Sequence, residues 1–97
     1  MAIKVIAELR AHPGHRDELR AVFERMLAAH ASDRPGFLGS SRYEKIDDPD
    51  VLVEIAEWES AEAREAHMKD AAAAGTYAPI LDLVAEPIRV AVLRSLA

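Results

Sequence analysis

The sequence predicts an α+β domain of the ferredoxin-like kind, in which helices pack on one face of a four-stranded antiparallel sheet. Segments with the two-residue period of strands and segments with helical spacing follow each other in the order βαβ and then βα(α)β. At 97 residues, with 51% apolar residues and few glycines and prolines, the chain fits a single ordered domain spanning residues 1–97.

The first predicted unit is a strand followed by an amphipathic helix. Apolar residues alternate from Ile3 to Leu9, and His12-Pro13-Gly14 ends this strand. From His15 to about Ala31, apolar residues recur at a spacing that gathers them on one helix face. They are Leu19, Val22, Phe23, Met26, Leu27 and His30.

A hairpin is expected after Pro35-Gly36. The second strand spans residues 37–46, and Asp47-Asp48-Pro49-Asp50 forms a turn, because aspartate side chains bond nearby backbone groups and proline fixes φ. The third strand then runs from Val51 to Trp58.

Capping residues bound the next two helices. The Ser60 hydroxyl can cap a helix that runs to about Ala74, and Gly75 suits the position after its C-terminus. Thr76 can cap a short third helix that tolerates Pro79 in its first turn and carries Tyr77, Ile80, Leu81 and Val84 on one face.

The final strand is predicted from Ile88 to Leu96, after the helix-breaking pair Glu86-Pro87. Both faces of the sheet carry apolar residues. The strand sides opposite Val5, Val53 and Val90 hold Ile6, Leu38, Leu52, Ala56, Ala91 and Leu93. Because neither face is fully polar, we expect a homodimer in which two sheets meet by two-fold symmetry and the helices stay outside.

Composition excludes several classes of partner. The net charge is −5, from 17 acidic residues against 12 Lys and Arg, and no segment concentrates basic residues, so nucleic acid is not an expected partner. No apolar run is long enough to span a membrane. The chain has no cysteine, which fits a reducing compartment, so we expect a cytoplasmic protein.

Several short motifs give the chain a resemblance to a known family. In order they are Ile3–Glu8 with Pro13-Gly14, Pro35-Gly36-Phe37, Arg42-Tyr43-Glu44, Asp48-Pro49-Asp50, Glu57-Trp58-Glu59-Ser60 and Glu65-Ala66-His67. Together they resemble the antibiotic biosynthesis monooxygenase domain family of the dimeric α+β barrel group, over essentially the whole chain.

The resemblance implies a homodimer whose protomers each hold a pocket between sheet and helices for a small, flat aromatic substrate. Several family members oxygenate quinols or polyketide anthrones with O₂ and without metal or flavin. It therefore implies a cofactor-independent monooxygenase acting on a quinol, a polycyclic phenol or an anthrone. In that chemistry the deprotonated substrate itself reduces O₂, and the protein supplies position, proton removal and exclusion of water.

His67 is the candidate base, because histidine changes protonation state near neutral pH. The alternative is a histidine buried at the contact between helix and sheet. Trp58, the only tryptophan, offers a ring for stacking but can equally be core, and strand alternation leaves open whether it faces the pocket or the dimer interface.

Four further residues are candidate substrate contacts. The Tyr77 phenol could donate a hydrogen bond to a bound oxygen, although packing is the commoner role of such a tyrosine. Phe23, Met26 and Leu27 are expected as apolar pocket wall or as core.

Two other groups of polar residues are weaker candidates for a site. Arg42 could orient an anionic substrate, but a charge pair with Glu44 or Glu54 across the dimer is the stronger expectation. His12, His15 and Asp17 span a Pro-Gly turn and lack a fourth ligand, so no metal site is expected.

Two alternative functions compete with oxygenation of a phenol. Relatives that degrade haem use an asparagine on the first strand, a tryptophan on the second helix and a later histidine. This chain has Ala7 or Glu8, His67 and Tyr77 at those places, so that set is missing. The other alternative is a non-catalytic dimer that binds a small hydrophobic ligand.

Overall fold

A computed structural model describes residues 2–30 and 34–96, and it has the predicted ferredoxin-like α+β fold. The elements are β1 (Ile3–Arg10), α1 (Arg16–Ala29), β2 (Phe37–Lys45), β3 (Asp48–Trp58), α2 (Ala61–Ala74), α3 (Ala78–Leu81) and β4 (Arg89–Arg94). The strands form one antiparallel sheet in the order β2-β3-β1-β4. The predicted end of the first helix near Ala31 lies outside the described residues.

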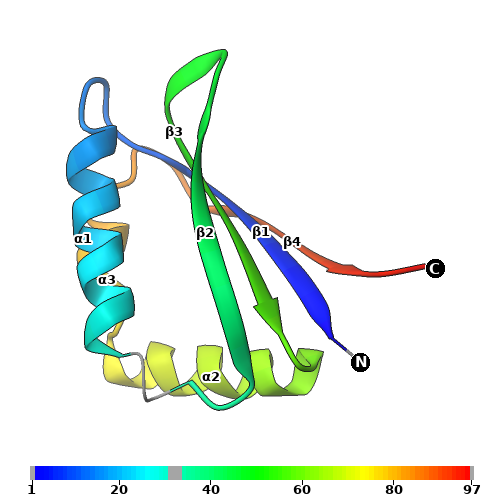
Figure 1. The fold of residues 1–97 in the computed structure, drawn as a ribbon. Helices are drawn as coiled ribbons and strands as arrows, with labels where there is room; N and C mark the ends of the chain where they lie inside the picture. The colour runs from blue at the N-terminus through cyan, green and yellow to red at the C-terminus, as the bar shows by residue number, and fades with distance from the viewer. Residues whose placement is uncertain (1, 31–33, 97) are drawn as a thin grey trace.

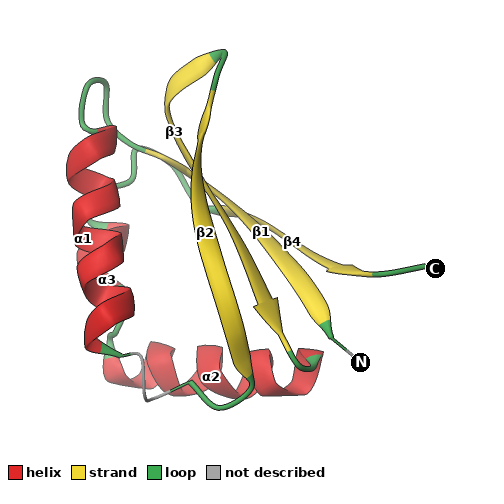
Figure 2. Cartoon of the chain, viewed as in Figure 1, coloured by secondary structure: helices red, strands yellow, loops and turns green. Residues whose placement is uncertain are grey.

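The helices lie along one side of the twisted sheet and leave its other face bare (Figure 1). Helices α1 and α3 run beside the sheet, while α2 crosses near the end where β2 begins and β3 finishes (Figure 2). A cavity lies between the sheet and the three helices.

Strand β3 begins three residues earlier than predicted, so the turn between β2 and β3 is shorter. Lys45 pairs with Asp48, and only residues 46–47 remain as the turn. Contacts with β1 explain the extension: Arg10 donates to the Asp48 carboxylate at 2.6 Å, and the Asp50 carbonyl accepts from the Ala11 amide at 2.9 Å. These partners lie far away in sequence, so the local turn signal could not reveal them.

The predicted caps of α2 are confirmed. The Ser60 Oγ accepts a hydrogen bond from the Ala63 amide at 3.1 Å, and Gly75 adopts the left-handed conformation with φ of 68°. The short α3 follows with Pro79 in its first turn, but Tyr77 occupies the N-cap position in place of Thr76 and gives no side-chain cap.

Strand register corrects the predicted faces of the sheet. Val5 lies opposite Ala56 and Leu9 opposite Leu52, and directly paired residues share a face. Leu52 and Ala56 therefore point to the helices together with Val5, not to the bare face as the sequence analysis expected. Alternation within a strand was right, but only pairing fixes which face each set joins.

The core has two buried clusters beneath the helices. One joins β1 and β3 to α1 and α3 and contains Leu9, Ala11, Leu19, Phe23, Leu52 and Ile80. The other lies near the start of α2 and contains Ile3, Val5, Ala56 and Trp58. Members of both clusters also line the cavity between the sheet and the helices, so the same side chains build the core and the cavity wall.

The bare face of the sheet is a mixture of apolar and charged residues. Ile6 on β1 pairs with Ile55 on β3 and with Ala91 on β4, and Leu93 remains 43% exposed. The ion pair of Lys4 with Glu57, 3.9 Å apart, lies on this face. Such a face is too apolar to be explained by solvent contact alone.

Gly36 joins the α1–β2 connection to the start of α2, and its replacement by alanine is expected to destabilise the fold. Its φ is 84°, and an added Cβ would lie 2.7 Å from the Ala63 Cβ and 3.0 Å from the Glu59 Cγ. We expect Gly36→Ala to lower the free energy of unfolding by about 2–4 kcal/mol in urea denaturation.

The matched control is Gly75→Ala. Gly75 also has positive φ, at 68°, but an added Cβ there meets nothing within 4 Å. This variant carries the conformational cost without the clash, about 1 kcal/mol. Equal losses in the two variants would show that the close approach to α2 contributes nothing.

Candidate functional site

The space between sheet and helices is a cavity of about 470 Å³ with a predominantly apolar wall. Its walls come from β1 and β3 of the sheet, from all three helices, and from the edge strand β4. Every predicted substrate-contact residue lines it: Phe23, Met26, Leu27, Trp58 and Tyr77. Size and apolar lining match what a small aromatic molecule requires.

Four aromatic rings contact one another in a row, and three of them, Phe37, Trp58 and Tyr77, line the cavity. The Phe37 and Trp58 ring centroids are 5.1 Å apart, those of Trp58 and His67 5.2 Å, and those of His67 and Tyr77 6.1 Å. Trp58 pairs with Ile3 on the helix-facing side and is 5% exposed. Its ring therefore belongs to the cavity wall and not to the bare face.

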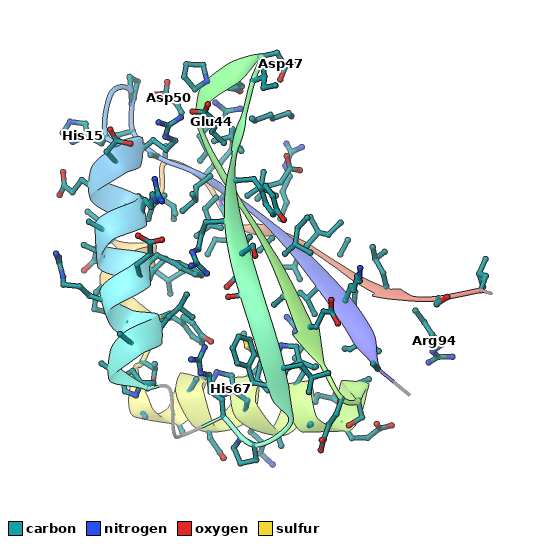
Figure 3. The ribbon with its side chains drawn as sticks, in the orientation of Figure 1. His15, Glu44, Asp47, Asp50, His67 and Arg94 are labelled. Atoms are coloured by element: carbon teal, nitrogen blue, oxygen red, sulfur yellow. The ribbon has the colours of Figure 1, made fainter. Side chains whose placement is uncertain are left out.

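His67 lies on the sheet-facing side of α2 (Figure 3) and is 9% exposed. Its Nε2 and the Tyr77 hydroxyl share a hydrogen bond of 2.8 Å, and the imidazole tautomer decides which group donates. The cavity is lined by Trp58 and Tyr77 but not by His67. The imidazole therefore lies behind the Trp58 and Tyr77 side chains, which separate it from the cavity.

The Tyr77 hydroxyl is held in its neutral form. Burial raises the pKa of this phenol, and the nearby negative charge of Glu54 raises it further, whereas Arg34 and Arg64 act in the opposite direction. At neutral pH the group can therefore both donate and accept a hydrogen bond at the cavity wall.

Three charged residues that sequence reasoning did not assign to the site also line the cavity: Arg34, Glu54 and Arg64. Arg34 closes the end of α1, donating to the carbonyls of His30 at 3.2 Å and Leu27 at 3.0 Å. Its guanidinium also lies 4.1 Å from the centre of the Phe37 ring. An arginine shortly after a predicted helix end was the available sequence signal.

Glu54 is a carboxylate on the central strand β3 that points into the cavity. Burial raises its pKa, and this effect outweighs the Ser40 hydrogen bond and the charges of Arg42, Arg34 and Arg64, which lower it. The sequence signal was that Glu54 occupies every-second-residue spacing with Ala56 and Trp58, the inward residues of the same strand. A charged residue among them is unusual, because burying a carboxylate is costly.

Arg42 has partners within its own chain. It donates to Glu24 Oε2 at 3.2 Å and to Ser40 Oγ at 2.9 Å, which links β2 to α1. Of the suggested metal ligands, His15 bonds to Glu18 at 3.0 Å. Within residues 2–30 and 34–96, no three His, Cys, Asp or Glu side chains are grouped so as to hold a metal ion.

Replacing Glu54 with glutamine is expected to stabilise the protein at neutral pH. Since the folded-state pKa is raised, the fold favours the protonated carboxyl. That contribution is complete below the unfolded-state pKa and is lost as pH rises through the folded-state pKa. Glu54→Gln should raise Tm by roughly 2–8 °C at pH 7 and leave it nearly unchanged near pH 4.

The control for this prediction is Glu65→Gln, at an exposed position of α2 away from both the cavity and the bare face. Its Tm should change little at either pH. A lower Tm for Glu54→Gln at pH 7 would mean that its attraction to the arginines outweighs the cost of burial.

The sequence profile of antibiotic biosynthesis monooxygenases matches residues 2–78 of the chain. The chain belongs to this monooxygenase family. The match covers β1 through the start of α3, and so includes most of the cavity wall with Trp58, His67 and Tyr77.

Two solved structures share this fold. Rv0793 from Mycobacterium tuberculosis is 26% identical, with a TM-score of 0.80 over 100% of this chain and 97% of that one. SnoaB, a cofactor-independent oxygenase from Streptomyces nogalater, is 19% identical, with a TM-score of 0.81 over 99% and 94%. The latter likeness concerns the fold alone.

A search of curated protein sequences finds no match to this family member. None of the helices in the described part of the chain is long and apolar enough to cross a bilayer.

Proposed function

We propose that the protein is a cofactor-independent monooxygenase that oxidises a quinol, a polycyclic phenol or an anthrone with O₂. The observation that carries the proposal is the cavity of about 470 Å³, which combines apolar walls with the bonded Tyr77–His67 pair. Membership of a monooxygenase family supports it. So does the fold shared with an oxygenase that is cofactor-independent.

The reaction needs little from the protein beyond what such a cavity offers. An electron-rich ring anion passes an electron to O₂, the two radicals recombine, and loss of water leaves a new carbonyl. Apolar walls hold the flat ring and keep bulk water from the reactive oxygen species. The Trp58 ring, 5% exposed at the cavity wall, offers a face for stacking.

His67 takes part in proton transfer through Tyr77. The Tyr77 hydroxyl lies at the wall of the cavity, and the imidazole behind it is 2.8 Å away, close enough to exchange a proton. A neutral phenol beside an imidazole can pass on a proton without carrying a charge into the apolar cavity. His67 therefore acts as the proton acceptor and Tyr77 as the group between it and the substrate.

The active species is a homodimer that forms a barrel from two sheets. The argument is the bare face, where apolar Ile6, Ile55 and Leu93 lie beside charged residues on the side that no helix covers. Sedimentation at micromolar concentration should give the mass of a dimer, and Ile6→Glu should give a monomer. A wild-type protein that sediments as a monomer would end this part of the proposal.

Oxygen uptake tests the function. The metal-free and flavin-free protein is mixed with reduced naphthoquinones and with anthrone, and O₂ consumption is followed above the rate of autoxidation. Turnover with at least one substrate supports the proposal. Tight binding of all of them without uptake would instead favour a non-catalytic ligand-binding dimer, and a Soret shift with haem would favour the haem alternative.

A further inference from the structure

The cavity holds more charge than stacking of a flat ring requires. Arg34 reaches it from the segment before β2, Arg64 from α2, and Glu54 from β3, while Tyr77 reaches it from the turn before α3. The Tyr77 phenol responds to the charges of the other three groups. The four groups therefore line one cavity whose other walls are largely apolar.

Glu54 is the only carboxylate among the described residues that line this cavity. Arg42 also lies near it, on the paired position of β2, but Arg42 does not line the cavity. Arg34 and Arg64 are thus the cations that share the cavity with Glu54.

We propose that Glu54 receives the proton of the substrate's ring hydroxyl, and that Arg34 and Arg64 then hold the ring oxyanion that this transfer creates. The O–H bond of the hydroxyl breaks and a new O–H bond forms on a carboxylate oxygen of Glu54. The electron pair of the broken bond stays on the ring oxygen. No electron leaves the substrate in this step, which rests on the proposed function and precedes the reaction with O₂.

Charge conservation favours this pathway. Before transfer, one negative charge on Glu54 faces the two arginines, and afterwards one negative charge on the ring oxygen faces them. The cavity therefore never holds an additional charge, which would be costly in apolar surroundings. Burial also makes Glu54 a stronger base than an exposed carboxylate, because its raised pKa lies closer to that of a phenol.

Glu54 and the Tyr77–His67 pair have separate tasks in this scheme. An anthrone carries the ring hydroxyl in its enol form, and the first proton leaves that hydroxyl. After O₂ has added to the ring carbon, the second proton leaves this carbon as the O–O bond breaks, and water is released. Glu54 takes the first proton. The second proton passes through the Tyr77 hydroxyl to His67.

Kinetics of Glu54→Gln test the assignment. We expect kcat for oxygen uptake to fall by at least about 100-fold while KM rises by no more than about 10-fold, and Glu54→Asp to recover part of the loss in kcat. In the wild type kcat should rise with pH as Glu54 ionises, and this acidic limb should be absent from the glutamine variant. Glu65→Gln, at an exposed position of α2 outside the cavity, should keep the wild-type kcat and pH profile. Full kcat in Glu54→Gln would overturn the proposal.

Binding provides a test that does not need turnover. Calorimetry should show that the wild type binds 1-naphthol more tightly than 1-methoxynaphthalene, which has no hydroxyl proton, by about 5–10-fold. This preference should shrink in Glu54→Gln. Arg64→Gln should weaken binding of the anion 2-hydroxy-1,4-naphthoquinone while leaving binding of 1-methoxynaphthalene unchanged.

The two tests separate the two proposals. If no substrate is turned over but the naphthol preference depends on Glu54, the oxygenase function fails while Glu54 remains the group that binds the hydroxyl. If turnover occurs and neither kcat nor the preference depends on Glu54, the assignment of Glu54 is wrong and the oxygenase function stands.

Discussion

Replacing His67 with alanine is expected to lower kcat for oxygen uptake by about 100-fold or more, the usual contribution of a group that transfers protons. The reason is that the Tyr77 hydroxyl loses its partner at 2.8 Å, so that no acceptor remains behind the phenol. Stopped-flow or electrode measurement of O₂ consumption across pH checks this, because loss of a titrating group also changes the pH profile.

His67→Gln distinguishes proton transfer from simple positioning. Glutamine can still bond to the Tyr77 hydroxyl but does not titrate. If the imidazole transfers a proton, kcat stays low in this variant; if it only orients Tyr77, most of the activity returns. His12→Ala, at an exposed histidine in the turn after β1, is the control and should retain full activity. Unchanged kcat in His67→Ala would refute the role of the imidazole.

Replacing Trp58 with alanine is expected to lower the free energy of unfolding by about 3–5 kcal/mol, as for other large buried aromatic residues. Trp58 is 5% exposed and packs between the Phe37 and His67 rings, so its loss removes contacts on both sides and opens a void. A domain of this size has about 5–15 kcal/mol in total. Urea denaturation followed by circular dichroism measures the change without relying on tryptophan fluorescence.

Trp58→Phe separates the structural role of this side chain from its role in the cavity. A phenylalanine keeps much of the apolar contact, so we expect a smaller loss of about 1–2 kcal/mol. KM for the aromatic substrate should nevertheless rise, because the smaller ring gives less area for stacking. A loss below 1 kcal/mol in Trp58→Ala would show that the cavity relaxes around the missing ring.

The local signals predicted the fold well because they act over a few residues. Ser60 and Gly75 bound α2 as expected, since a cap needs only its neighbouring amides and a left-handed φ. The β2–β3 turn was predicted too long, because the Asp48–Arg10 bond and the pairing of Asp50 with Ala11 extend β3 through contacts across the sheet.

The candidate site was predicted in part. Trp58, Tyr77 and the three apolar residues of α1 all line the cavity. Helical spacing indicated the inward face of α1, whereas strand alternation left the face of Trp58 open. Glu54 and the two arginines were missed. Their importance depends on burial and mutual distance, and polar residues in a sequence read first as solvent contacts.

By itself, the sequence determined the order of the elements, the caps of α2 and the residues that carry the family resemblance. Periodicity and capping depend only on residues close together in the chain. The tertiary structure decided that Trp58 faces the helices, that His67 stands behind Tyr77, and that Glu54 shares a cavity with Arg34 and Arg64. The physical reason is register: pairing between strands distant in sequence assigns every side chain of a strand to one face or the other.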